Sequence, residues 1–238
     1  MRLLVTRPEP DAGRTAAKLV ALGHEPMIQP LLTIAFSPPP PRDLPVPGAL
    51  IVTSQNAVRA LARWPQSQGW QAMPIFAAGQ ATSRALTDLG YRDVRTGARD
   101  AGSLAEIVLA TLSTDAGPIL YPAARDRAGA LAGGLTARGY DVRTVEAYRA
   151  DPVERLGAAV REAFIEGTID GVLVYSGRTA RTLIDLGNRE DIAVALGKPL
   201  YFVISEHVAG IVRGVGGSVK VAPRPDEDSL LALIPAGG

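Results

Sequence analysis

Cysteine is absent from the 238 residues of this chain, and histidine occurs only as His24 and His207. The lack of cysteine excludes disulfides, thiolate catalysis and zinc–thiolate sites. Two histidines are too few for a histidine-rich metal site and leave little for a conventional Ser-His-Asp triad. We therefore expect no metal site. His24 follows a glycine that is expected to end a helix, so we expect it at the surface.

An excess of one charge is missing as well. Lys plus Arg number 25 and Asp plus Glu 24, a formal net charge of +1. A general nucleic-acid-binding protein normally carries a basic excess, so we expect no nucleic-acid partner. No stretch approaches the roughly 18 apolar residues of a membrane span, and the apolar run after Arg2 is shorter than the roughly 7–15 residues of a secretory signal core. We expect a cytoplasmic protein with no membrane partner.

Hydrophobic residues, in contrast, are plentiful at 47%, against 21% charged residues. This is enough apolar material for buried cores, and it excludes disorder for the bulk of the chain. At about 150 residues per domain, the length predicts one large domain or two small ones.

Three kinds of segment occur twice in the chain, in permuted order. The pairs are Leu50–Leu61 with Val172–Leu183, Ile75–Ser83 with Tyr201–Ala209, and Ile119–Tyr140 with Leu3–His24. Two complete sets arise only if the N-terminal segment joins the C-terminal half. We therefore expect a discontinuous lobe (residues 1–34 plus 151–238), a continuous lobe (41–147) and linker strands at 35–40 and 148–150. The alternative is that repeats this weak arise by chance in an α/β chain.

Each repeated segment has the pattern of a strand, a turn and a helix. Short apolar runs such as Leu50–Val52 and Val172–Val174 are typical of parallel strands buried on both faces. The glycines expected to cap helix C-termini are Gly23, Gly90, Gly139 and Gly187. The expected fold class is α/β, with two flavodoxin-like, doubly wound parallel-sheet lobes joined by a two-stranded linker.

The turns that follow the expected strands are rich in Ser, Thr, Asn, Gly and Arg. Ligands of open parallel sheets bind at this edge, beside helix N-termini whose free N–H groups favour anions. Repetition in both lobes would aim two sets of donors across one cleft. The plainer interpretation is that Ser54, Ser176 and Ser205 are ordinary helix N-caps. No turn matches a P-loop or a G-x-G-x-x-G motif, so nothing specific supports nucleotide binding.

Arginines follow three of the strand ends, at Arg7, Arg125 and Arg178. Together they could neutralise a ligand with several carboxylates, although a solvent-exposed side chain is the commoner outcome for any one of them. For His207, in another of these turns, lining a site without catalysis is the favoured interpretation. Tyr148 ends the continuous lobe and either faces the cleft or packs at the hinge.

These segments together resemble the uroporphyrinogen-III synthase family over nearly the whole chain. The resemblance is carried by LLVTRPEPDAG, LIVTSQNAV, FAAGQATSRALTDLGY, ILYPAARDRAGALAGGLTARGYDV, VEAYRA, VLVYSGRTARTL and a last segment from ISEHVA to PRPDEDSLLALI. No segment is diagnostic alone, but their order, spacing and permuted repeat are more specific. The family's two α/β lobes with a two-stranded linker agree with the organisation expected from the repeats.

The resemblance implies an enzyme of tetrapyrrole biosynthesis, a cyclising hydro-lyase that needs no cofactor and is expected to be a monomer. It would convert hydroxymethylbilane, a linear tetrapyrrole, into uroporphyrinogen III with loss of water and inversion of the D ring, through an azafulvene and a spiro-pyrrolenine. Because the pyrrole itself expels the hydroxyl, the protein's principal contribution would be to position the two ends of the substrate.

The resemblance also implies roles for single residues. Tyr148 matches a family tyrosine whose phenol, protonated at neutral pH, could assist departure of the hydroxyl. The expected substrate-binding residues are Thr6, Arg7, Ser54, Asn56, Gln80, Ala81, Thr82, Arg125, Ser176, Arg178, Ser205 and His207. Many family members carry Gly-Pro-Thr-Thr in the last turn where this chain has Ser-Glu-His-Val, which makes Ser205 or His207 the candidate substitute for a family threonine.

Two other functions stay open. A non-catalytic, two-lobed tetrapyrrole- or anion-binding protein is suggested by the divergent last turn and the shortage of acid–base residues. A sugar-phosphate or nucleotide enzyme rests on fold analogy alone, and the phosphate loop that it would need is missing.

Overall fold

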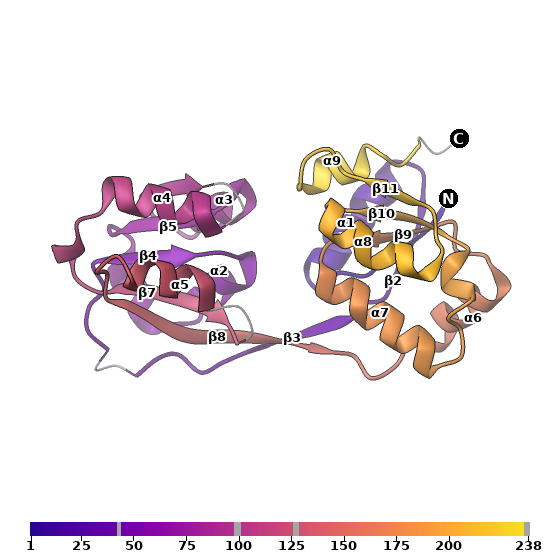
Figure 1. The fold of residues 1–238 in the computed structure, drawn as a ribbon, viewed down its shortest axis with the longest axis horizontal. Helices are drawn as coiled ribbons and strands as arrows, with labels where there is room; N and C mark the ends of the chain where they lie inside the picture. The colour runs from indigo at the N-terminus through magenta and orange to yellow at the C-terminus, as the bar shows by residue number, and fades with distance from the viewer. Residues whose placement is uncertain (42–43, 98–100, 126–128, 236–238) are drawn as a thin grey trace. The chain divides into compact units, whose positions relative to one another are not determined.

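The structure is a computed structural model that describes residues 1–41, 44–97, 101–125 and 129–235. The chain divides into two units (Figure 1). Unit 1 comprises Met1–Thr33 and Asp151–Gly238, and unit 2 comprises Ile34–Ala150. Each unit has its own sheet and its own hydrophobic core.

Within the described residues, unit 1 contains a five-stranded parallel sheet in the order β11-β10-β9-β1-β2. Its strands are β1 (Arg2–Val5), β2 (Glu25–Ile28), β9 (Gly171–Val174), β10 (Leu200–Val203) and β11 (Val219–Val221). Its helices are α1 (Asp11–Ala21), α6 (Ala158–Glu166), α7 (Gly177–Arg189), α8 (Glu206–Val212) and α9 (Glu227–Leu231), with 3₁₀ turns at Ala195–Gly197 and Arg213–Val215.

The described part of unit 2 contains a six-stranded sheet in the order β3-β8-β7-β4-β5-β6. Its strands are β3 (Leu32–Phe36), β4 (Ala49–Val52), β5 (Pro74–Ala78), β6 (Asp93–Gly97), β7 (Ile119–Ala124) and β8 (Val142–Pro152). Its helices are α2 (Gln55–Leu61), α3 (Gln80–Asp88), α4 (Ala101–Thr111) and α5 (Gly129–Thr136), with 3₁₀ turns at Pro65–Trp70 and Thr114–Ala116. The pairs β7–β8, β4–β7, β4–β5 and β5–β6 are parallel.

The strand order in unit 1 is flavodoxin-like. Numbered by their order along the chain, its five strands lie as 2-1-3-4-5. Strands β8, β7, β4, β5 and β6 repeat this spatial order in unit 2, but there the chain enters at the third position, β4. This different point of entry explains why the repeated sequence segments occur in permuted order. The predicted fold class, α/β with two doubly wound parallel sheets, is confirmed.

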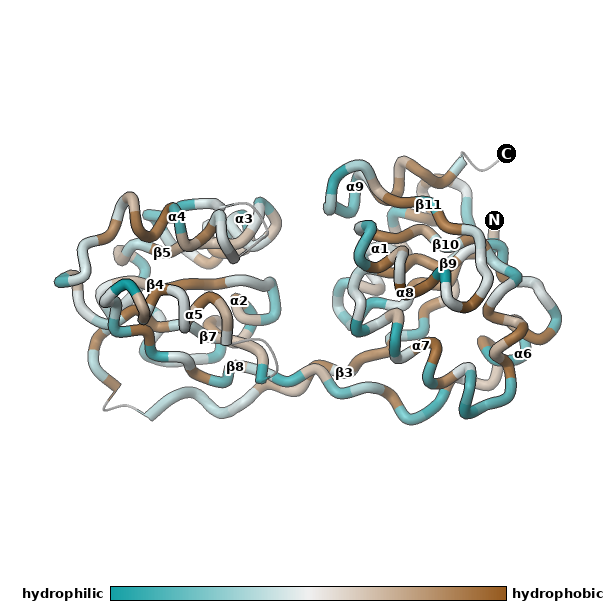
Figure 2. Tube along the Cα trace, viewed as in Figure 1, coloured by the Kyte–Doolittle hydropathy of each residue, from teal (hydrophilic) through white to brown (hydrophobic). Residues whose placement is uncertain are grey.

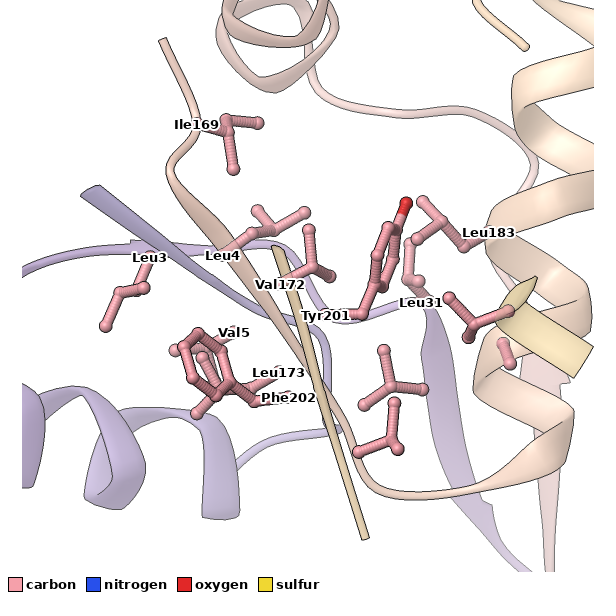
Figure 3. Packing of buried hydrophobic residues seen from close by; sticks show 14 of the residues in the cluster. Leu3, Leu4, Val5, Leu31, Ile169, Val172, Leu173, Leu183, Tyr201 and Phe202 are labelled. Carbon is pink, nitrogen blue, oxygen red and sulfur yellow. The ribbon is translucent and has the colours of Figure 1, made fainter. Parts of the chain in front are cut away.

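The strands bury residues on both faces, as the uninterrupted apolar runs predict. All four residues of β4 and of β9 are buried. Figure 2 shows hydrophobic stretches along the strands and hydrophilic ones in the loops. In unit 1, Leu4 and Val172 lie on one face of the sheet and Val5 and Phe202 on the other (Figure 3). Helices must therefore cover both faces of each sheet.

The strands β3 and β8 carry the chain from one unit to the other. The Ser37 N–H donates to the Ala147 carbonyl (3.0 Å) and the Val153 N–H to the Leu31 carbonyl (3.1 Å), so the two strands run antiparallel. Strand β3 spans Leu32–Phe36 and strand β8 spans Val142–Pro152, against linker strands expected at 35–40 and 148–150. Residues 38–41 are four prolines, which have no N–H to donate to a strand ladder.

The predicted helix caps are confirmed at Gly23, Gly90 and Gly139, which have φ values of +79°, +97° and +91°. The prediction for Gly187 is wrong, because α7 continues to Arg189 and the left-handed residue is Asp191 (φ 57°). Gly187 instead allows close packing, since a Cβ there would overlap the Leu196 side chain.

The expectation that His24 lies at the surface is also wrong, because its exposed fraction is 6%. Its N–H donates to the Leu19 carbonyl (3.0 Å) across the left-handed Gly23, a Schellman motif. The residue after the glycine in this motif commonly packs back on the helix, and Tyr91 and Tyr140 are buried in the same way after Gly90 and Gly139. The local turn therefore buries this position whatever its polarity.

Gly48, directly before β4, should not tolerate a side chain. An added Cβ would overlap the Ala116 carbonyl oxygen and lie 2.6 Å from its carbon. We expect Gly48→Ala to lower the free energy of unfolding by about 1–3 kcal/mol, measured by urea titration. Gly133→Ala, in α5 and with nothing near its Cβ, is the control and should raise it by about 0.5–1 kcal/mol. Equal effects of the two substitutions would contradict the packing argument.

Candidate functional site

The point at which the strand order reverses marks a candidate site in each sheet. The order reverses between β7 and β4 in unit 2 and between β1 and β9 in unit 1. Ligands of doubly wound sheets bind beyond the carboxyl ends of the strands at such points. The residues that follow these four strands are Arg125, Thr53 and Ser54, Thr6 and Arg7, and Tyr175 and Ser176.

In unit 2, the structure brings two predicted residues together, Ser54 and Tyr148. Ser54 caps α2, and its Oγ accepts a hydrogen bond from the Ala57 N–H (3.1 Å). The same Oγ lies 2.8 Å from the Tyr148 hydroxyl, which reaches it from β8. Tyr148 is only 7% exposed. A capped helix start after β4 and a buried phenol from β8 therefore form one hydroxyl pair at this edge of the sheet.

A β-bulge in β8 determines the direction of Tyr148. Along the β7–β8 ladder Ala123 pairs with Glu146 but Ala124 pairs with Tyr148, so Ala147 is the extra residue. Both Ala147 and Tyr148 are buried in the same hydrophobic cluster as Leu120. Regular alternation would turn residues 147 and 148 to opposite faces. The bulge thus brings Tyr148 to the face on which Ser54 lies.

A second tyrosine lies on the opposite face of this sheet. The Tyr121 hydroxyl is 3.3 Å from Thr53 Oγ1, and Tyr121 belongs to the cluster packed under α4 and α5. Tyr148 belongs instead to the cluster under α2 and α3. Consecutive residues of the turn after β4 therefore hold hydroxyl groups from β7 and β8 on different faces.

Arg125, expected to bind substrate, is held by an acidic neighbour. Its Nε and Nη2 lie 2.9 and 3.2 Å from Glu146 oxygens, and its backbone N–H donates to the Tyr148 carbonyl (3.1 Å). The Ser37 hydroxyl also donates to Glu146 (2.8 Å). Hydrogen bonds from Arg125 and then from Ser37 lower the pKa of the Glu146 carboxyl. Arg125 is half-exposed, at 54% of its side chain.

The other expected residues of unit 2 lie at the starts of α2 and α3. Asn56 Oδ1 accepts a hydrogen bond from Arg59 (2.5 Å). Gln80 and Ala81 are exposed, whereas Thr82 in the same turn is only 5% exposed. The polar group of Thr82 is thus buried at the first turn of α3, at the carboxyl end of β5.

In unit 1, the expected serines occupy equivalent turns. Ser176 caps α7 and accepts from the Thr179 N–H (3.1 Å), and Ser205 precedes α8 without a side-chain cap bond. His207 is exposed. A Cβ placed on Gly177 would lie 3.1 Å from His207 Nε2, so the histidine ring lies against the start of α7. The turns after β9 and β10 therefore adjoin, with half-buried Arg178 in the first turn of α7.

Thr6 and Arg7, after β1, make contacts inside unit 1. Thr6 is fully buried and its hydroxyl donates to the Leu173 carbonyl (2.6 Å). Arg7 Nη1 lies 2.8 Å from Glu227 Oε1, and the guanidinium stacks over the Tyr175 ring at 4.4 Å. Such a charge over an aromatic face is attractive. Thr6 thus links the end of β1 to β9, and Arg7 links it to Tyr175 and to Glu227 in α9.

Glu227, in α9, accepts hydrogen bonds from several segments of the chain. Besides Arg7, the Thr15 hydroxyl donates to its Oε1 (2.5 Å) and Lys18 Nζ to its Oε2 (2.7 Å). Burial alone would raise the pKa of Glu227, but the hydrogen bonds from Lys18 and Thr15 and the charge of Arg7 outweigh it, and the pKa is lowered. Burial and then the Glu227 charge raise the pKa of the Tyr175 phenol. The cluster therefore holds Glu227 ionised.

Sequence reasoning missed several residues of these clusters: Ser37, Tyr121, Glu146 and Glu227. Glu146 lies in the same VEAYRA segment as Tyr148, but its partners Ser37 and Arg125 directly follow β3 and β7. Glu227 is 220 residues from Arg7. Contacts between residues so far apart in the sequence leave no pattern in the local sequence, and they become visible only when the order of the strands in the sheet is known.

Neither a membrane span nor a metal cluster is found in the part of the chain that the structure describes. No helix in these ranges is long and apolar enough to cross a membrane. No group of three or more His, Asp or Glu side chains there could hold a metal ion.

Comparison with known proteins identifies relatives over almost the whole length. The family model described as uroporphyrinogen-III synthase HemD matches residues 13–232. The structure is similar to that of uroporphyrinogen-III synthetase from Helicobacter pylori (TM-score 0.65, 19% identity, 98% of each chain covered). It is also similar to a mutant uroporphyrinogen III synthase from the bacterium Thermus thermophilus (TM-score 0.59, 19% identity, 98% of this chain and 96% of the other). At this identity the structures establish the fold alone. No curated protein sequence matches.

The ion-pair cluster around Glu227 predicts a pH-dependent contribution to stability. We expect Glu227→Gln to lower the free energy of unfolding at pH 7 by about 1–3 kcal/mol, because buried donors lose a charged acceptor. Since folding lowers the pKa of Glu227 below its ordinary 4.5, the contribution is present above that pH and is lost as the pH falls through the lower, folded-state value. Urea unfolding at pH 7 and pH 3 measures it.

Glu25→Gln is the matched control. Glu25 is 73% exposed and pairs with Arg2 at 3.6 Å, so its loss should change stability by less than about 0.5 kcal/mol. An equal loss in both variants, or a Glu227→Gln effect that is no smaller at pH 3 than at pH 7, would contradict the assigned ion pair.

Proposed function

Because the chain belongs to the uroporphyrinogen-III synthase family, we propose that it cyclises hydroxymethylbilane to uroporphyrinogen III, with D-ring inversion and loss of water. The observation that carries this proposal is the family match over residues 13–232. The Ser54–Tyr148 pair supports it, since its phenol hydroxyl lies at the edge of a sheet where ligands bind.

Tyr148 is the proposed proton donor. Its phenol gives a proton to the substrate's hydroxyl oxygen while the C–O bond breaks, and the electron pair leaves with the oxygen as water. The pyrrole nitrogen supplies electrons and leaves a positively charged azafulvene. The azafulvene carbon bonds to the substituted α-carbon of ring D, which gives the spiro-pyrrolenine. The bond from that α-carbon to the methylene of ring C then breaks and leaves a second azafulvene on ring C, whose methylene carbon bonds to the free α-carbon of the inverted ring D. This last carbon loses its hydrogen as a proton, which returns to the phenolate. The protein thus ends the cycle unchanged, and no external oxidant or reductant is needed.

The substrate's acetate and propionate carboxylates explain the need for many hydrogen-bond donors. We propose contacts from the turns after the strands, made by Asn56, Gln80, Ala81, Thr82, Ser176, Arg178, Ser205 and His207, with Arg7 and Arg125 in the same turns. Ser54 and Thr6 lie in these turns too, but the Ser54 hydroxyl contacts Tyr148, and Thr6 is fully buried with its hydroxyl on the Leu173 carbonyl. Arg7 and Arg125 would share their guanidinium groups between substrate and the carboxylates of Glu227 and Glu146. This arrangement favours selection by geometry over a simple excess of positive charge.

We also propose a cytoplasmic monomer that acts on a free small molecule, without cofactor, membrane or nucleic-acid partner. The near balance of 25 basic and 24 acidic residues supports the last point.

The distribution of porphyrin isomers tests the function directly. The purified protein, given freshly prepared hydroxymethylbilane, should yield mostly isomer III after oxidation and chromatographic separation. Without protein, the same substrate closes to the uninverted isomer I. Isomer ratios identical to the no-protein control, together with tight binding of uroporphyrin, would instead indicate a non-catalytic tetrapyrrole-binding protein.

Tyr148→Phe tests the proton donor. We expect kcat to fall about 100-fold or more with little change in KM, because the phenol acts only as the C–O bond breaks. Tyr121→Phe, which removes a similar hydroxyl on the opposite face, is the control and should keep wild-type kcat. Wild-type turnover by Tyr148→Phe would remove Tyr148 from the mechanism and leave the family's function intact.

A further inference from the structure

We infer that Ser54 is a positioning residue for Tyr148, not a substrate ligand: its hydroxyl donates to the phenol oxygen, directs the phenol proton outward and holds the phenolate that forms. This inference deepens the proposed function and rests on it.

The number of hydrogen bonds that the Ser54 hydroxyl can make is consistent with its role as a positioning residue for Tyr148. A serine hydroxyl has one hydrogen to donate and accepts with two lone pairs. The Ala57 N–H already donates to Ser54 Oγ at 3.1 Å, as part of the N-cap of α2. This bond fixes the position of Oγ, so the 2.8 Å contact with the Tyr148 oxygen has a defined geometry. The hydroxyl hydrogen of Ser54 stays free to rotate toward Tyr148.

The direction of the Ser54–Tyr148 hydrogen bond follows from the proton transfer. A phenol has a single hydrogen, and in the proposed reaction this hydrogen goes to the departing hydroxyl of the substrate. The contact with Ser54 can then exist only with Ser54 as donor. After transfer, the phenolate oxygen carries a negative charge, and a hydrogen bond to a charged group is about twice as strong as a neutral one. Ser54 therefore stabilises the charge at the moment when it forms.

The backbone holds both partners in place. The Tyr148 carbonyl accepts from the Arg125 N–H (3.1 Å), and the preceding Ala147 carbonyl accepts from the Ser37 N–H (3.0 Å). Tyr148 is thus held between β7 and β3, with its ring buried, while Ser54 is held by its helix. Preorganised donors of this kind cost no reorganisation during the reaction.

Three substitutions separate positioning from capping. Ser54→Gly removes the hydroxyl but keeps most of the capping, because glycine is a tolerated N-cap; Ser54→Ala removes both; Ser54→Thr keeps both. We expect kcat to fall about tenfold in Ser54→Gly and Ser54→Ala, with KM within twofold of wild type, and Ser54→Thr to retain at least half of wild-type kcat. Only Ser54→Ala should lose appreciable thermal stability.

A spectroscopic titration tests the same contact without turnover. The difference in ultraviolet absorbance between wild type and Tyr148→Phe, followed with pH, isolates the ionisation of this phenol. In the Ser54→Gly background, with Ser54→Gly/Tyr148→Phe as reference, its midpoint should move upward by about one pH unit, because the phenolate has lost a donor. Tyr121→Phe should leave the midpoint unchanged.

Different failures have different meanings. A raised KM with unchanged kcat in Ser54→Gly would make Ser54 a substrate ligand and overturn the inference. An unmoved titration midpoint would overturn it as well. If wild-type protein makes only isomer I, the proposed function fails first, and the titration alone decides whether Ser54 donates to Tyr148.

Discussion

Strand β8 pairs with β7 on one side and with β3 on the other, and these two ladders determine much of the molecule. The parallel ladder with β7 completes the flavodoxin-like order of unit 2, whereas the antiparallel ladder with β3 carries the chain from one unit to the other. The bulge at Ala147 lies where both ladders meet. Because backbone hydrogen bonds on both sides hold this short segment and the bulge shifts its alternation, Tyr148 lies on the face of Ser54 and contacts it.

The clusters at the sheet edges consist of hydroxyl groups and ion pairs, and they show what the chain offers in place of cysteine and histidine. Without cysteine and with two histidines, the chain relies on hydroxyl groups and ion pairs. Arg7 with Glu227 and Arg125 with Glu146 are each fixed within one unit by carboxylates from distant segments. A reaction in which the substrate expels its own leaving group needs a defined shape and one proton donor more than it needs strong acids or nucleophiles.

Local signals were sufficient where the chain makes local structure. The strands, the left-handed caps at Gly23, Gly90 and Gly139, and the serine N-caps Ser54 and Ser176 follow from patterns a few residues long. Two local predictions failed for different reasons. Leu196 packs next to Gly187, where α7 continues, whereas at His24 the error was to overlook the Schellman motif, a local turn that buries the residue after the glycine. Both failures concern helix ends, which are the least sharply defined parts of a helix.

The sequence by itself determined the α/β class, the permuted repeat, the strand ends that carry polar turns, and the family. Its apolar runs and turn residues suffice for these features because they depend on neighbours in the chain. The tertiary structure alone decided that Ser54 lies against Tyr148, that Arg7 and Arg125 are paired with Glu227 and Glu146, and that Tyr121 lies on the opposite face. These contacts join residues 21 to 220 positions apart. They depend on strand order and on one bulged residue, which reverses the face of every side chain after it.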